Sequence, residues 1–196
     1  MKKFKTVTTV LVMALIAGTS TSFAQDKMMK DKKMKEKTVM VGGAEMYPSK
    51  NIVENAVNSK DHTTLVAAVK AAGLVETLQG DGPFTVFAPT NKAFDKLPKG
   101  TVATLLKPEN KKRLQTVLTY HVVAGNMKAA DIVKAIKKGN GTATFKTVSG
   151  GKLTVMMKGK KVMLKDENGG MATVSIANVN QSNGVIHVID SVVLPK

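Results

Sequence analysis

Two apolar segments that lie about one hundred residues apart constrain the fold of this chain most strongly. The first is FTVFAPTNKAF, residues 84–94, and the second is GVIHVIDSVVLP, residues 184–195. Each begins with apolar residues at consecutive positions, which is typical of a β-strand covered on both faces. A further apolar strand signal lies between them, at residues 120–123. Because covered strands must share a core, we expect a single compact domain that the last strand ties together.

The start of the chain has the features of a secretory signal peptide. Three lysines within the first five residues precede an apolar run at residues 10–17, and Ser-Phe-Ala at 22–24 places small residues at a cleavage site. The apolar run is too short to cross a bilayer. We therefore expect residues 1–24 to be removed and the protein to be periplasmic or secreted. The chain contains no cysteine, so its core must hold it together without disulfides.

Residues 25–46 have the composition of a disordered linker rich in lysine and methionine. The stretch DKMMKDKKMKEK mixes charges without an apolar period, so it cannot bury enough surface to offset the entropy of ordering. Its methionines are soft ligands of the kind that copper(I) prefers, but they lack a close repeat. We therefore predict no metal site and no cofactor, and we expect the folded domain to span residues 47–196.

The apolar period changes along this domain, which predicts an α+β fold. In the first half, Leu65, Val69 and Ala72 fall on one face of a helix that Gly73 ends. From residue 142 onward the period is two, and Lys158-Gly159-Lys160 and Asn168-Gly169-Gly170 are typical of hairpin turns. Several short helices followed by a meander of strands belong to the α+β class.

Taken together, the apolar segments resemble the fasciclin domain, also called FAS1 or βIg-H3. FTVFAPTNKAF resembles the first motif of that family, Tyr120-His121 resembles its central Tyr-His motif, and NGVIHVIDSVVLP from Asn183 resembles its second motif. The resemblance covers about residues 46–196 and implies a wedge-shaped β-sandwich flanked by helices. It also implies an exported or surface-held adhesion module with no shared catalytic activity, similar to the small secreted bacterial members.

The residues that match the family motifs are expected to be structural. They are Phe84, Thr85, Val86, Phe87, Ala88, Pro89, Thr90, Asn91, Phe94, Tyr120, His121, Gly184, Val185, Ile186, His187, Val188, Ile189 and Asp190. Tyr120 and His121 lie in the predicted strand at 120–123, so each needs an internal hydrogen-bond partner when buried. In some animal members, an Asp-Ile pair before the second motif is implicated in integrin binding. Here Asn178-Val179 stands at that position, so the resemblance does not imply an integrin-type role.

The remaining polar residues do not predict catalysis. His187 and Asp190 are three positions apart on a strand, so they point to opposite faces, and we expect Asp190 to be a hydrogen-bonded structural carboxylate. His62 lies in the first turn of a helix and is expected to face solvent. No two histidines have the spacing of metal ligands, and no Gly-x-Ser-x-Gly elbow is present. A hydrolase that uses His121 or His187 is therefore disfavoured.

The positive charge of the chain is concentrated in one stretch. The net charge is +16, and residues 108–165 hold thirteen Lys or Arg residues against two acids. This stretch has only Tyr120 and Phe145 as aromatics and one arginine, whereas nucleic-acid surfaces favour stacking rings and guanidinium groups, so nucleic acid is not an expected partner. The candidate anion-binding residues are Lys111, Lys112, Arg113, Lys152, Lys158, Lys160, Lys161 and Lys165.

Two functions remain open at this point. The first is an exported, non-enzymatic adhesion module that binds a cell-surface protein or an anionic polysaccharide through its basic surface. The second is a periplasmic ligand-binding or scaffolding protein whose basic charge is incidental and serves solubility.

Overall fold

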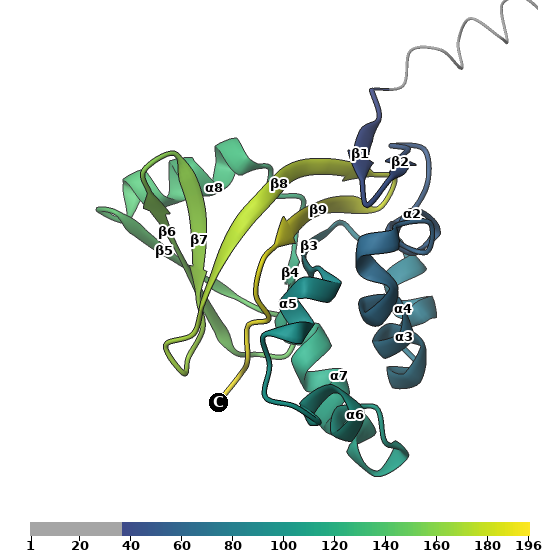
Figure 1. Cartoon of the computed structure of the whole chain (residues 1–196). Coiled ribbons are helices and arrows are strands. Elements are labelled where there is room, and N and C mark those ends of the chain that lie inside the picture. Colours follow the sequence, from purple (N-terminus) through teal and green to yellow (C-terminus); the bar gives the residue numbers. More distant parts are fainter. Residues whose placement is uncertain (1–36) are drawn as a thin grey trace, which may run out of the picture. The chain divides into compact units, whose positions relative to one another are not determined.

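The computed structural model describes residues 37–196, and the predicted signal peptide and most of the predicted linker lie outside the described residues. Its helices and strands are shown in Figure 1. The helices are α2 (Ile52–Ala56), α3 (Thr63–Ala72), α4 (Val75–Gln79), α5 (Asn91–Asp95), α6 (Thr101–Leu105), α7 (Lys111–Tyr120) and α8 (Ala129–Lys138), with 3₁₀ turns η1 (Lys60–His62) and η2 (Pro108–Asn110). The strands are β1 (Val39–Val41), β2 (Ala44–Met46), β3 (Phe84–Pro89), β4 (Val122–Ala124), β5 (Thr142–Lys146), β6 (Lys152–Lys158), β7 (Lys161–Lys165), β8 (Met171–Gln181) and β9 (Gly184–Ile189).

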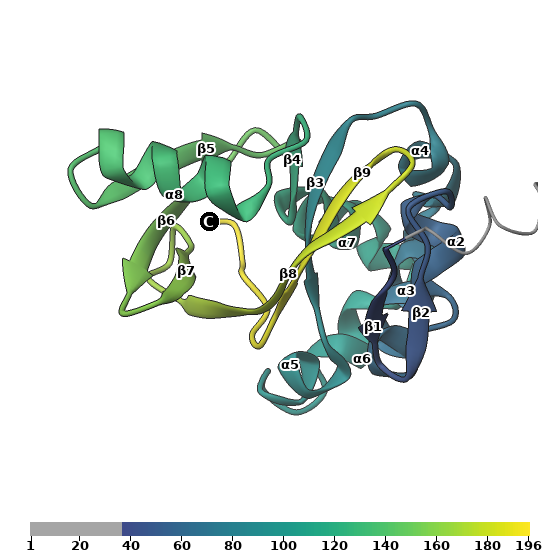
Figure 2. The same cartoon turned by 90° about the horizontal axis from the view of Figure 1, so that it is seen from above.

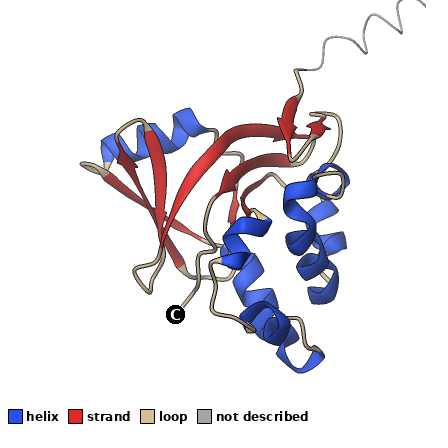
Figure 3. Cartoon of the chain, in the orientation of Figure 1, coloured by secondary structure: helices blue, strands red, loops and turns tan. Residues whose placement is uncertain are grey.

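The predicted α+β class is confirmed. Short helices dominate the first half of the described chain, and strands β5 to β9 follow one another in the second half (Figure 3). Both predicted hairpin turns are present, because β6 pairs with β7 around residues 158–161 and β7 pairs with β8 around residues 165–171, in each case antiparallel.

The two apolar segments lie side by side in the sheet. The order of the seven-stranded sheet is β4-β3-β9-β8-β7-β6-β5, and β3 runs parallel to β9 from the pair Phe84–Gly184 to the pair Pro89–Ile189. All six residues of β9 are buried, as are five of the six in β3. The expectation that the last strand lies inside the molecule is therefore confirmed.

The sheet bends back on itself and forms two layers, as seen from above in Figure 2. Strand β8 has two register shifts against β9, and irregular pairing of this kind bends a strand. At the other end, Val123 bridges Thr147, and the N–H of Val148 donates to the carbonyl of Val122 at 2.8 Å. The result is the predicted sandwich, nearly closed into a barrel.

Strands β3 and β9 are apolar at consecutive positions because their two faces contact different apolar clusters. Phe87 and Ile189 belong to a cluster inside the bent sheet, which α8 covers through Ile132 and Ile136. The residues on the opposite face of both strands, Val86 among them, pack against α2 and the β1–β2 hairpin. A third cluster joins α3 to α7. None of the helices between residues 37 and 196 has the length and apolar character of a membrane span.

Two sequence-based boundaries differ from the structure. The predicted strand at 120–123 begins only at Val122, because the helical apolar period of α7 continues through Tyr120, and His121 caps that helix. The predicted linker boundary at residue 46 also does not hold. Residues 39–46 form the β1–β2 hairpin, whose Val41 and Met46 are each 3% exposed against the core, so the ordered domain starts earlier than expected.

Candidate interaction surface

The polar groups of the first motif are used inside the fold. Thr85 Oγ1 donates to the carbonyl of Gly125 at 2.6 Å and accepts the N–H of Met127 at 2.9 Å. Thr90 Oγ1 caps α5 by accepting the N–H of Ala93 at 3.3 Å. Thr85 therefore holds the loop between β4 and α8, and Thr90 starts α5 directly after β3.

His121 joins the end of α7 to the C-terminal segment. Its Nδ1 lies 2.8 Å from the carbonyl of Val117, and its Nε2 accepts the N–H of Val193 at 3.2 Å. Burial lowers the pKa of His121 to about 4, with the hydrogen bond to Val117 and the charge of Asp166 acting in the opposite direction. The ring is therefore neutral at neutral pH, and both of its nitrogens are occupied.

Tyr120 has the internal partners that its burial requires. Its hydroxyl donates to the carbonyl of Lys152 at 2.6 Å and accepts the N–H of Glu167 at 3.3 Å. Burial raises the pKa of Tyr120 to about 12. The Tyr-His pair thus ties α7 to β6, to the β7–β8 turn and to the chain end.

His187 and Asp190 do not form a catalytic pair. His187 Nε2 lies 2.9 Å from the carbonyl of Met127, and its Nδ1 accepts the N–H of Asn178 at 3.4 Å. Burial lowers the pKa of His187. Asp190 instead accepts the N–H of Thr173 at 2.7 Å, which is the role expected of a structural carboxylate.

His62 was expected to face solvent, and this expectation is wrong. Its side chain is 3% exposed, because the 3₁₀ turn η1 carries it onto the same face of the helix as Leu65. Nδ1 lies 2.9 Å from Ser59 Oγ, whereas Nε2 is buried without a hydrogen-bond partner. Burial lowers the pKa of His62, and the backbone of Ala88 and the charge of Asp61 act in the opposite direction.

The basic residues fall into two groups that the fold separates. Lys111, Lys112 and Arg113 begin α7, which packs against α3 and α6. The other candidates lie on β6 and β7 and in the turn between them. Both views place β6 and β7 far from α6 and the start of α7 (Figures 1 and 2). The eight candidate residues therefore do not form one patch.

The second group forms a surface that we call the lysine face, on the outward side of β5, β6 and β7. Lys146 is paired with Lys152 and Lys158 is paired with Lys161, so two pairs of lysines lie directly opposite each other on neighbouring strands. The members of the lysine face are Lys146, Lys152, Lys158, Lys161 and Lys165, all exposed. Lys160 lies in the turn beside it.

The strands of the lysine face carry no acidic residue on their outward side. The outward positions of β5 to β8 carry lysine, threonine, methionine and serine but no Asp or Glu. Glu167 borders the face and accepts the backbone N–H of Lys152 at 2.9 Å. Within residues 37–196 the one ion pair, Lys107 with Glu109, lies elsewhere. Like charges directly opposite each other on a sheet are destabilising, so this arrangement carries a cost in the free protein.

The reverse side of the same strands is fully packed. Leu153, Val155 and Leu164 alternate with the outward residues and have no exposed surface. The lysines are therefore presented from a rigid sheet rather than from a loop. Sequence reasoning missed Lys146. Its position two residues after Thr144, with Phe145 between them, is the signal that could have placed it on the outward side of the strand.

Comparison with known proteins agrees with this fold. Residues 60–195 match the family model described as the Fasciclin domain. The chain belongs to the fasciclin family. A solved structure described as a FAS1 domain pair from the insect cell adhesion molecule Fasciclin I has the same fold, with a TM-score of 0.67 and 19% identity, over 76% of this chain and 52% of that one.

Two relatives of this fasciclin-family chain come from bacteria. Protein sll1483 of Synechocystis is 48% identical over 160 residues, which cover 82% of each chain. The cell surface glycolipoprotein MPB83 of Mycobacterium bovis is 36% identical over 145 residues, which cover 71% of this chain and 58% of that protein.

The position that departs from the animal fasciclin pattern has an internal role. Asn178 has a φ of 59° in the irregular part of β8, and its Oδ1 accepts the N–H of Ala129 at 2.7 Å, where α8 begins. Val179 is 1% exposed. Asn178 therefore positions α8, and Val179 packs in the core.

Proposed function

We propose that this chain is an exported, non-enzymatic interaction module that binds an anionic polysaccharide at the cell surface through the lysine face. The observation that carries the proposal is the opposition of Lys146 to Lys152 and of Lys158 to Lys161, without a neighbouring carboxylate on those strands. An anionic ligand would relieve the repulsion that these pairs impose on the free protein.

The chemistry of the lysine face favours a flexible polyanion over nucleic acid. Its ammonium groups are compact point charges that suit carboxylate or sulfate groups, and it holds no arginine or aromatic ring for stacking on bases. Thr144 and Thr154 lie between the lysines with their hydroxyls 3.4 Å apart, and they offer hydrogen bonds to sugar hydroxyls.

Kinship supports a location at the cell surface. MPB83 is named a cell surface glycolipoprotein, and Fasciclin I is described as a cell adhesion molecule. The alternative is a periplasmic ligand-binding or scaffolding protein whose basic charge is incidental. The two functions differ in whether binding depends on where the positive charges lie on the surface.

Retention on an immobilised acidic polysaccharide such as alginate tests the proposal. The double variant Lys158→Glu/Lys161→Glu alters the lysine face, and the control Lys111→Glu/Lys112→Glu alters the start of α7 by the same net charge. We expect the first variant to elute at much lower salt than the native protein and the control to elute close to it, because exposed charge contacts are screened by salt. Equal loss in both variants would favour incidental charge.

A further inference from the structure

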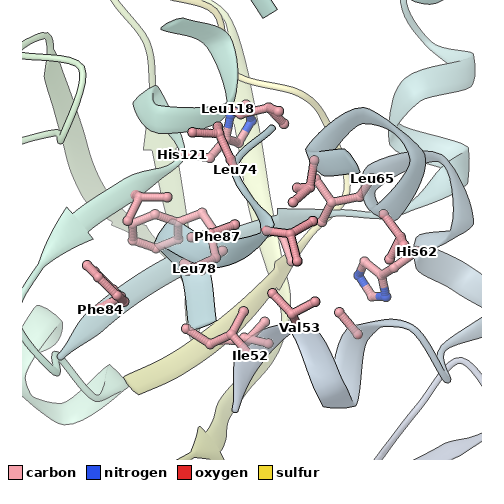
Figure 4. Close-up of a pocket in the computed structure, with 18 of the residues that line it drawn as sticks. Ile52, Val53, His62, Leu65, Leu74, Leu78, Phe84, Phe87, Leu118 and His121 are labelled. Atoms are coloured by element: carbon pink, nitrogen blue, oxygen red, sulfur yellow. The ribbon is translucent and has the colours of Figure 1, made fainter. Parts of the chain in front are cut away.

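An apolar cavity lies between the helices of the first half and the sheet. It holds about 80 Å³ and is lined by side chains from the β1–β2 hairpin, α2, α3, α4, β3 and the end of α7. Figure 4 labels lining residues from α2, α3, α4, β3 and the end of α7. Nearly all of the lining is aliphatic or aromatic. Among its members are Ile52, Leu65, Leu78, Phe84 and Leu118. None of the residues of the lysine face lines the cavity, so it takes no part in the function proposed above.

One polar atom in this lining has no partner. Only 3% of the His62 surface is exposed, and its Nε2 makes no hydrogen bond in the described structure. The other histidine in the lining, His121, uses both ring nitrogens. A buried polar atom without a partner costs free energy, so the Nε2 of His62 favours an occupant that can form a hydrogen bond with it.

A water molecule alone is a poor occupant. A buried water needs two to four polar partners, and the enclosed part of the lining offers few besides His62. Lys70 and Thr77 are exposed residues of the lining, and the Thr119 hydroxyl is already bonded to the carbonyls of Gln115 and Thr116. Dry cavities lined by aliphatic side chains bind small apolar molecules instead.

The cavity has a partly open side. Val53 of α2, Val66 of α3 and Val75 of α4 are apolar lining residues of intermediate exposure. Helix α4 has no buried residue, so it is the least firmly packed part of the wall. A ligand longer than the enclosed space can therefore extend between these helices.

We propose that this cavity binds a slender aliphatic alcohol, with the hydroxyl at His62 Nε2 and the alkyl chain along α3 and α4. A straight chain suits the small enclosed volume better than a ring system does. A hydroxyl can both donate and accept a hydrogen bond, so it pairs with either neutral tautomer of His62, which Ser59 leaves open. It also avoids burying a charge beside an apolar wall.

Binding of 1-hexanol and of n-hexane to the native protein, followed by the methyl resonances of valine, leucine and isoleucine, tests this proposal. We expect saturable shifts at cavity-lining methyl groups with both compounds, and an affinity about two- to tenfold higher for the alcohol because of its hydrogen bond. The variant His62→Phe should abolish that preference and still bind n-hexane.

A second variant tests the location. Val66→Trp fills the cavity and should remove binding of both compounds, whereas Ala67→Trp, on the exposed side of the same helix, should leave both unchanged. If Val66→Trp fails to fold, Val75→Trp at the open side replaces it. Absence of saturable shifts in the native protein, an unchanged alcohol preference in His62→Phe, or equal binding by both tryptophan variants would overturn the proposal.

Discussion

Phe87 and His187 are register partners on the parallel strands β3 and β9, and their rings stack with 5.7 Å between centroids and 27° between planes. The two residues come from the two motifs that lie about one hundred positions apart in the sequence. Their contact joins the first and last parts of the domain at its centre. The same junction helps to position α8, because His187 also holds the loop before α8 through the carbonyl of Met127.

Truncation of Phe87 or Ile189 to alanine is expected to lower the free energy of unfolding by about 3–4 kcal/mol, as large deletions in a packed core do. Both side chains are fully buried in the cluster inside the sheet. Urea denaturation measures the change, and Val148→Ala, at a residue that is 50% exposed, is the control. Near-native midpoints for both core variants would contradict the two-sided burial of β3 and β9.

The β1–β2 hairpin is expected to contribute to stability through one face only. Met46→Ala should lower the free energy of unfolding by about 2–4 kcal/mol, because that side chain is 3% exposed in the second apolar cluster. Met40→Ala changes the same residue type in the same hairpin at a position that is 57% exposed, and its effect should stay within about 0.5 kcal/mol. Thermal or urea denaturation that ranked the two variants alike would show that the hairpin does not pack on the domain.

Stability is expected to fall on acidification between about pH 6.5 and pH 4. In the unfolded chain His121 binds a proton near pH 6.5, whereas burial lowers its pKa in the folded protein to about 4. Stability is therefore complete above pH 6.5 and decreases as the unfolded state takes up a proton that the folded state excludes, by at most about 3 kcal/mol for this residue. The pKa values of His62 and His187 are also lowered, so they act in the same direction.

The variant His121→Gln tests whether His121 causes this loss of stability on acidification, since glutamine does not titrate. Urea denaturation of the variant between pH 7.5 and pH 4 should show a shallower loss of stability than the native protein. Parallel pH curves for the two proteins would mean that His121 does not cause the acid sensitivity.

Because the lysines of the lysine face repel one another, replacing one of them with an acid should raise stability while it weakens binding. The single variant Lys161→Glu places a carboxylate opposite Lys158 and should stabilise the protein by up to about 1 kcal/mol at low salt. The same variant should weaken retention on alginate. Lys134→Glu, at an exposed residue on α8, is the control for net charge, and it should leave retention close to native. A loss of both stability and binding in Lys161→Glu would contradict the described pairing.

Much of this fold could be predicted because its strongest signals are local. Consecutive apolar residues in β3 and β9, the alternation in β6 and β7, and the glycine-containing turns each reflect one strand or one hairpin. The hairpin at 39–46 was missed because it is short and follows a stretch of charged residues that dominates its composition. The β-branched residues Val122 and Val123 that follow Tyr120 predict a strand at that position, whereas the helical period of α7 extends through it.

The candidate sites were harder to predict because they depend on which elements are neighbours. Alternation placed Lys161 and Lys165 on one side of their strand, but pairing of Lys146 with Lys152 depends on the β5–β6 register. The separation of Lys111 from these residues depends on the packing of α7 against α3, which cannot be predicted from a local sequence pattern. For His62, spacing of three from Leu65 was an available signal of burial that its polar character obscured.

The most direct test of the lysine face is an amide chemical-shift titration of the native protein with an alginate oligosaccharide. The account predicts that the largest shifts, reversed by added salt, occur at Lys146, Lys158 and Lys161 and at their outward neighbours on β5 to β7. Shifts centred on Lys111 and Lys112 at the start of α7, or spread evenly over all lysines, would contradict it.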